Sequence, residues 1–162
     1  MENNNRLSNL EWIFERQLYW IAASEIKTAA IITVAIGMLG ALASAFTLNT
    51  SHSCIAQMLS IAVASLLILS LIFAGMVILP RLDGPVNSLL FFGSISKSSR
   101  KGYVSKLISC TDDDLITDFA NQIHRNAEVA QIKHQWAARA LLTVFLTAIP
   151  WVITLIALTN SK

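Results

Sequence analysis

Thr28 to Leu48 reads TAAIITVAIGMLGALASAFTL, a run of 21 residues in which no side chain carries a charge. Two further runs of the same kind follow, Met58–Leu79 and Ala140–Leu158. A helix needs about 20 apolar residues to cross the hydrocarbon core of a bilayer, and all three runs come close to or reach that length. The polar remainder of the chain is too short to cover three buried helices. The sequence therefore predicts an all-α membrane protein with three transmembrane helices.

The composition agrees with this prediction. Hydrophobic residues make up 54% of the 162 residues and charged residues only 14%, whereas soluble domains usually carry about 25% charged residues. The three runs hold no Asp, Glu, Lys or Arg. That argues against a proton relay or an ion-coupled transporter, because such proteins place ionisable groups inside the membrane.

Basic residues are distributed unevenly around these runs. Apart from Lys162, every Lys and Arg lies either in residues 1–27 or in residues 80–139. Cytoplasmic loops are enriched in Lys and Arg, so both segments are predicted to be cytoplasmic. The 159–162 tail is then predicted to lie on the outside.

Residues 1–27 are predicted to form an amphipathic helix that leads into the first span. Ser8 and Glu11 fit a capping box at its start. Two interpretations stay open: the helix lies on the inner leaflet, or it packs on residues 80–139. Its apolar face consists of Leu10, Ile13, Phe14, Leu18 and Ile21. It also carries three aromatic residues of the kind that settle at lipid headgroups, Trp12, Tyr19 and Trp20.

Residues 80–139 are predicted to form a helical sensor segment, the part of the chain in which a ligand would bind. A helix start is predicted at Thr111–Asp114, where acidic side chains would lie at the positive end of the helix dipole. No Pro or Gly follows before Arg139. The helix is therefore expected to continue into the third span, where Pro150 predicts a kink.

On a helical wheel with 100° per residue, this helix has a buried apolar stripe and a polar row beside it. The row can hold a partly desolvated ligand, or it can make hydrogen bonds between the helices of neighbouring subunits. The second interpretation is the simpler one from the residues alone. The stripe consists of Ile116, Phe119, Ile123 and Ala130, and the row of Gln122, Asn126 and Lys133.

Motifs of catalysis and metal binding are missing from the sequence. It has no glycine-rich phosphate loop, nucleophile elbow, HExxH pair or cysteine cluster. No catalytic residue, metal or cofactor is therefore predicted, and the protein is not expected to be an enzyme. Small residues recur four apart at Gly37, Ala41 and Ala45. Because this spacing lets helices approach closely in lipid, a homo-oligomer is expected.

Several short motifs lie between the second and third runs. With the three runs around them, they make the chain resemble the transmembrane effectors of Pycsar, the pyrimidine-cyclase anti-phage defence systems of bacteria. SLATT-type effectors of other nucleotide-dependent defence systems share the layout and are an alternative. The motifs are FFGSIS at Phe91–Ser96, Tyr103, Asp114-Leu115, QIHRNA at Gln122–Ala127 and IKH at Ile132–His134.

The resemblance implies a role that the residues alone do not indicate. A partner pyrimidine cyclase would make cyclic CMP or cyclic UMP upon infection. The effector would respond by impairing the bacterial inner membrane, which causes abortive infection. Its partners would be the lipid bilayer and the cyclic nucleotide, with no nucleic acid. Two alternatives remain, a holin-like toxin that needs no nucleotide and a non-lethal membrane scaffold.

In that role Gln122 and Asn126 are predicted to read the edge of the pyrimidine, and Lys133 to meet the phosphate. Phe92 or Tyr103 is predicted to stack on the base. A basic stretch earlier in the segment is an alternative partner for the phosphate or for anionic lipid: Lys97, Arg100 and Lys101.

Overall fold

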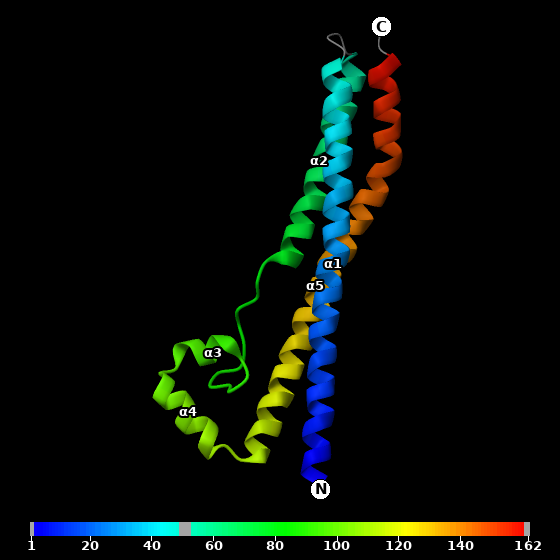
Figure 1. The fold of residues 1–162 in the computed structure, drawn as a ribbon. Coiled ribbons are helices and arrows are strands. Elements are labelled where there is room, and N and C mark those ends of the chain that lie inside the picture. Colours follow the sequence, from blue (N-terminus) through cyan, green and yellow to red (C-terminus); the bar gives the residue numbers. More distant parts are fainter. Residues whose placement is uncertain (1, 49–52, 161–162) are drawn as a thin grey trace. The chain divides into compact units, whose positions relative to one another are not determined.

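The computed structural model describes residues 2–48 and 53–160, and within them every regular element is a helix. Three of the helices are long and apolar enough to cross a membrane, which confirms the predicted fold class. The helices follow one another as shown in Figure 1: α1 Glu2–Leu48, α2 Cys54–Ile78, α3 Phe92–Lys97, α4 Arg100–Ser109 and α5 Asp112–Asn160.

Two helix starts show how far local signals reach. Thr111 and Asp114 exchange hydrogen bonds, with the Thr111 N–H donating to Asp114 Oδ2 at 3.0 Å and the Asp114 N–H to Thr111 Oγ1 at 3.3 Å. This confirms the predicted start of α5, which runs unbroken to Asn160. The capping box at Ser8 is wrong, because α1 begins six residues earlier, at Glu2. No Pro or Gly lies between the two positions, so nothing stops the helix from extending.

Helices α2 and α5 extend beyond the uncharged runs predicted to span the membrane, α2 at its start and α5 at its end. α2 begins at Cys54 rather than Met58, because Ser53 caps it by accepting a hydrogen bond from the Ala56 N–H at 3.2 Å. At the other end of the chain, α5 takes in the first half of the predicted 159–162 tail. Residues 161 and 162 lie outside the described residues.

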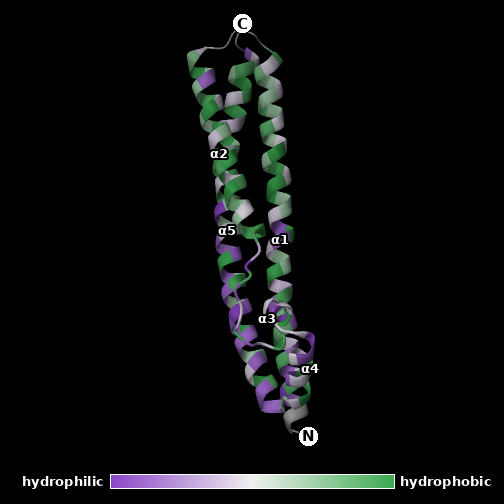
Figure 2. Ribbon diagram, turned by 90° about the vertical axis from the view of Figure 1, so that its left-hand side faces the viewer, coloured by the Kyte–Doolittle hydropathy of each residue, from purple (hydrophilic) through white to green (hydrophobic). Residues whose placement is uncertain are grey.

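The chain forms two compact units. The first comprises residues 1–23 and 80–132, and the second comprises residues 24–79 and 133–162. The second unit therefore holds the three candidate spans, the apolar parts of α1, α2 and α5 coloured green in Figure 2. The first unit holds α3, α4 and the polar half of α5.

The spans of the second unit pack along one seam. Along α2 its buried residues recur at alternating intervals of four and three, the heptad spacing of helices that wrap around each other. Most are small, and small residues let helices approach closely in lipid. The buried residues are Ser24, Thr28, Ile31, Ala35, Leu42 and Ala45 on α1, Ala56, Ser60, Val63, Leu67, Ser70, Ala74 and Val77 on α2, and Lys133, Ala140, Val144, Thr147, Thr154 and Leu158 on α5.

Side-chain hydrogen bonds link different helices of this seam. The Ser70 hydroxyl donates to the carbonyl of Ala140 at 2.8 Å, and the Trp151 indole N–H donates to the carbonyl of Met38 at 2.9 Å. Other hydroxyls bond within their own helix, as Thr28 does to the Ser24 carbonyl at 2.7 Å. Every such bond satisfies a polar group where a bilayer offers no water.

The stripe of small residues on α1 does not form one surface. Gly37 and Ala41 are exposed, whereas Ala45 is 8% exposed and belongs to the seam within the chain. A Cβ added at Gly37 would meet nothing within 4 Å. The predicted oligomer stripe is therefore wrong for Ala45, because the heptad spacing of the seam differs from a repeat of four and crosses it.

The N-terminal part of α1 packs within the first unit. The rings of Phe14 and Phe119 meet edge to face with centroids 5.7 Å apart, which confirms the packed interpretation for this face of the helix. Trp12 and Tyr19, on other sides, are each 63% exposed. Their placement at lipid headgroups stays a prediction.

Candidate functional site

The five residues predicted to bind a ligand lie in both units. Gln122 and Asn126 belong to the first unit, where Gln122 is 4% exposed and Asn126 is half-buried. The wheel had placed Gln122 beside the buried stripe, and that placement is wrong. Ile116 and Ile123, predicted to be buried, are only half-buried. The buried face follows Phe119, Gln122 and Val129 and so continues the heptad spacing of the spans.

Lys133 lies in the second unit and has protein partners. Its Nζ donates to Glu25 Oε1 at 2.6 Å and to the Val77 carbonyl at 2.5 Å, near the end of α2. Its side chain is 5% exposed, against 47% for Glu25. The wheel placed Lys133 beside the buried stripe as well, whereas the structure buries it. Two of the three donors of this ammonium are therefore used within the protein, and a phosphate would have to reach the third at a side chain that is almost fully buried.

The two aromatic candidates differ in their surroundings. Phe92 is 62% exposed and lies against Phe91, with ring centroids 5.0 Å apart. Tyr103, on α4, donates its hydroxyl to the Leu89 carbonyl at 3.2 Å and so ties α4 to the loop before α3. Both residues belong to the first unit, and neither borders the pocket described next.

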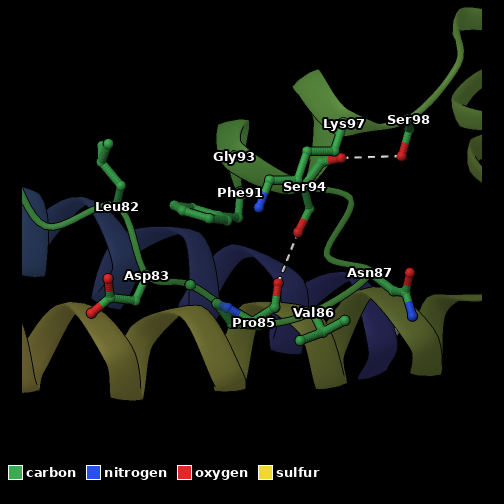
Figure 3. Close-up of a pocket in the computed structure, with 11 residues that line it drawn as sticks. Leu82, Asp83, Pro85, Val86, Asn87, Phe91, Gly93, Ser94, Lys97 and Ser98 are labelled. Carbon is green, nitrogen blue, oxygen red and sulfur yellow. Dashed lines mark hydrogen bonds between the residues drawn. The ribbon is translucent and has the colours of Figure 1, made fainter.

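A pocket of about 320 Å³ lies in the first unit, between the loop that follows α2 and helix α3 (Figure 3). Residues 82–87 form one side of it, and Phe91, Gly93, Ser94, Lys97 and Ser98 form the other. The Ser94 hydroxyl donates to the Pro85 carbonyl at 2.9 Å and joins the two sides. None of the five predicted ligand residues lines this pocket, although Lys97, from the alternative basic stretch, does.

Two glycines fix the ring of Phe91 in this pocket. A Cβ at Gly84 would come within 2.5 Å of ring carbons of Phe91, and a Cβ at Gly93 would do the same. Atoms at that distance overlap, so both positions need glycine for the ring to stay where it is. Asn87 adopts φ 62°, the left-handed conformation that Asn tolerates better than most residues. The loop therefore has a defined shape set by Gly84, Asn87 and Gly93.

Helix α5 holds the loop in place at Asp118. Asp118 Oδ2 accepts the backbone N–H groups of Leu89 at 2.7 Å and Leu90 at 3.3 Å. The Ser88 hydroxyl accepts the next donors, from Leu90 at 3.1 Å and Phe91 at 2.9 Å. The backbone N–H groups of residues 89–91, just before α3, are thus all hydrogen-bonded to the side chains of Asp118 and Ser88.

A second attachment runs through Arg125. Its guanidinium donates to the Asp83 carbonyl at 3.0 Å and to the Asp83 carboxylate at 2.8 Å. The same side chain donates to Glu128 at 2.8 Å, and this hydrogen bond holds the pKa of Glu128 below its usual value. Asp83 borders the pocket, so its charge is paired there. Within residues 2–48 and 53–160 there is no group of three acidic, His or Cys side chains that could hold a metal ion.

The comparison with known families covers nearly the whole chain. A model described as the Pycsar effector protein domain matches residues 9–159. The chain belongs to the Pycsar effector family. It is 29% identical over 132 residues to the Pycsar effector protein PtPycTM of Propioniciclava tarda, a match that spans 76% of this chain and 65% of that Pycsar effector. About a third of the relative therefore lies outside the match. No solved structure matches this Pycsar effector.

Sequence reasoning missed the residues that build the pocket of this Pycsar effector. The prediction named Phe92 and not its neighbour Phe91. Only the close approach of Gly84 and Gly93 to the Phe91 ring, where an added Cβ would overlap it, shows that Phe91 is the enclosed one. A signal was available, since two glycines seven and two positions from one aromatic ring suggest a close approach to it. Asp118 and Arg125 gave no such signal, because their partners lie 28 to 42 residues away.

Proposed function

We propose that this protein is the membrane effector of a Pycsar anti-phage defence system, activated by cyclic CMP or cyclic UMP. The observation that carries the proposal is the family match over residues 9–159, which includes all three helices able to cross a membrane. In this proposal a partner pyrimidine cyclase makes the nucleotide during infection. The effector then impairs the inner membrane, and the infected cell dies before the phage matures.

The proposed action is physical and needs no catalysis by this chain. Most of the buried residues in the seam of the second unit are small, which lets its helices approach closely in more than one packing arrangement. A ligand that prefers one packing of the spans over another shifts the population toward it. Repacking within a homo-oligomer would then open a path for ions.

The proposed orientation places the first unit in the cytoplasm. Residues 1–27 and 80–139 carry every Lys and Arg except Lys162, and such segments stay on the cytoplasmic side. The cyclic nucleotide would then reach the first unit directly from the cyclase. The connection between α1 and α2 and the end of α5 would lie outside.

The test is dye leakage from liposomes that carry the full-length protein, with cyclic CMP or cyclic UMP added in turn. Leakage with one of these nucleotides and not with cyclic AMP is the expected result, and it would name the signal. Leakage without any nucleotide would replace the proposal with a toxin-like protein. No leakage under any condition would favour a membrane scaffold. Coexpression with and without a pyrimidine cyclase repeats the comparison in cells.

A further inference from the structure

The geometry points to the pocket between residues 82 and 98 as the binding site of the cyclic mononucleotide, with Phe91 against the base and Lys97 against the cyclic phosphate. This inference rests on the proposed function and assigns the site on which that function depends. It moves the ligand away from Gln122 and Lys133.

The charge of the pocket suits one phosphodiester. Asp83 is its acidic residue, and the carboxylate is bonded to Arg125 at 2.8 Å. Lys97 is its cation and is exposed, and its ammonium makes no hydrogen bond or ion pair within the described residues. An ammonium without a partner is available to an anion, whereas Lys133 already has two partners. A cyclic nucleotide carries a single negative charge, which one lysine can match.

The size of the pocket favours a mononucleotide. Small-molecule sites range from about 300 to 1,000 Å³, and this pocket, at about 320 Å³, lies at the lower limit. A dinucleotide signal would need roughly twice the room of a mononucleotide.

Phe91 provides the stacking surface. Its ring is only partly covered and is kept in position by the backbone of Gly84 and Gly93. An aromatic ring that is already fixed loses little freedom when a base stacks on it. Asn87 lines the same pocket, and its side-chain amide can both donate to and accept from a pyrimidine edge.

The pocket is also attached to the helix that enters the membrane. Asp118 holds the loop through the amides of Leu89 and Leu90, and Arg125 holds it through Asp83. Both side chains belong to α5, which continues without a break to Asn160. A ligand that reshapes the loop therefore acts on α5 through two polar contacts. The predicted ligand residues Phe92 and Tyr103 lie near this loop without facing the pocket.

The experiment measures binding of radiolabelled cyclic CMP and cyclic UMP to the full-length protein in nanodiscs. Two pairs of variants are compared: Lys97→Gln with Lys101→Gln, and Phe91→Leu with Phe92→Leu. We expect Lys97→Gln and Phe91→Leu to weaken binding about tenfold or more, because each removes a main contact of the ligand. Lys101→Gln and Phe92→Leu, outside the pocket, should leave affinity within about twofold, less than the loss of one ordinary hydrogen bond.

The outcomes separate the two proposals. Equal binding by wild type, Lys97→Gln and Phe91→Leu would overturn the site and leave the proposed function standing. Loss of binding in Gln122→Ala or Lys133→Ala, with Lys97→Gln unaffected, would return the site to the residues predicted from the sequence. A wild-type protein that binds neither nucleotide would overturn the proposed function. Because the Lys97 side chain is exposed, Lys97→Gln should leave the fold unchanged. Circular dichroism checks that Phe91→Leu is folded.

Discussion

The two partners of the buried ion pair between Lys133 and Glu25 should differ in what their loss does to stability. Lys133 lies 2.6 Å from the Glu25 carboxylate and 2.5 Å from the Val77 carbonyl. The lysine side chain is 5% exposed and the glutamate 47%. Glu25→Ala leaves a buried ammonium with a single carbonyl partner. Lys133→Met removes the buried charge and leaves a carboxylate that already reaches water.

The magnitudes follow from that asymmetry. Leaving a charge buried without its partner costs about 3–5 kcal/mol, and because Val77 still accepts one bond we expect about 3 kcal/mol for Glu25→Ala. Lys133→Met keeps an apolar stem of similar length and loses hydrogen bonds from a charged donor, so we expect about 1–2 kcal/mol. The double variant should resemble Lys133→Met and be more stable than Glu25→Ala alone.

The assay is reversible unfolding of the full-length protein in mixed micelles, followed by tryptophan fluorescence and analysed as a double-mutant cycle. The cycle should give a coupling free energy of at least about 1 kcal/mol. If Lys133→Met is the more destabilising single variant, or if the two effects simply add, the account of this ion pair is refuted. Lys101→Met, which replaces an exposed lysine, serves as the control for the substitution itself.

Three further predictions concern single contacts. Asp114 accepts hydrogen bonds from Thr111, which hold its pKa below 3.8, so its contribution to stability is present above its unfolded pKa and is lost as the pH falls through its folded pKa; Asp114→Asn should lower the unfolding midpoint at about pH 7, and the difference from wild type should shrink steadily as the pH falls below 3.8. Trp151→Phe loses the bond to Met38, and the same unfolding assay should show a loss of about 0.5–1.5 kcal/mol; an unchanged midpoint would show that the bond is not made in micelles. Arg125→Gln should weaken both nucleotide binding and leakage from liposomes, because it leaves the Asp83 carboxylate in the pocket unpaired and releases the loop from α5; unchanged binding and full leakage would show that these bonds matter for neither.

The fold could be read from the sequence because it depends on a property that each residue carries by itself. Three uncharged runs of bilayer length predicted the three spans, and Thr111 with Asp114 predicted the start of α5. The start of α1 at Glu2 was missed, because a good capping motif at Ser8 does not stop a helix that has no reason to end. A local capping motif shows that a helix can begin at a position, but it does not determine whether the helix begins there or earlier.

The candidate site could not be read in the same way, because its properties depend on distant partners. Lys133 is a polar residue in the sequence and a buried one in the structure, since its partner Glu25 lies 108 positions away. Gln122 is only 4% exposed although its side chain is polar, so its hydropathy gives no sign of its burial. Phe91 and Phe92 are the same residue type, and only the close approach of the Gly84 and Gly93 backbone to the Phe91 ring distinguishes them.

The seam of the spans has a consequence for how their alignment is maintained. Most of its buried residues are small, although larger ones such as Leu42, Leu67 and Leu158 lie among them, so a helix that slides past its neighbour by one turn, about 5.4 Å, again brings many small residues into contact with its neighbour. Packing alone therefore distinguishes weakly between neighbouring alignments. The native alignment is selected by directional contacts: the hydroxyl of Ser70 on the Ala140 carbonyl, the indole of Trp151 on the Met38 carbonyl, and the ammonium of Lys133 on Glu25 and the Val77 carbonyl. A substitution at Ser70 or Trp151 thus changes which alignment the helices adopt, in addition to how tightly they hold together.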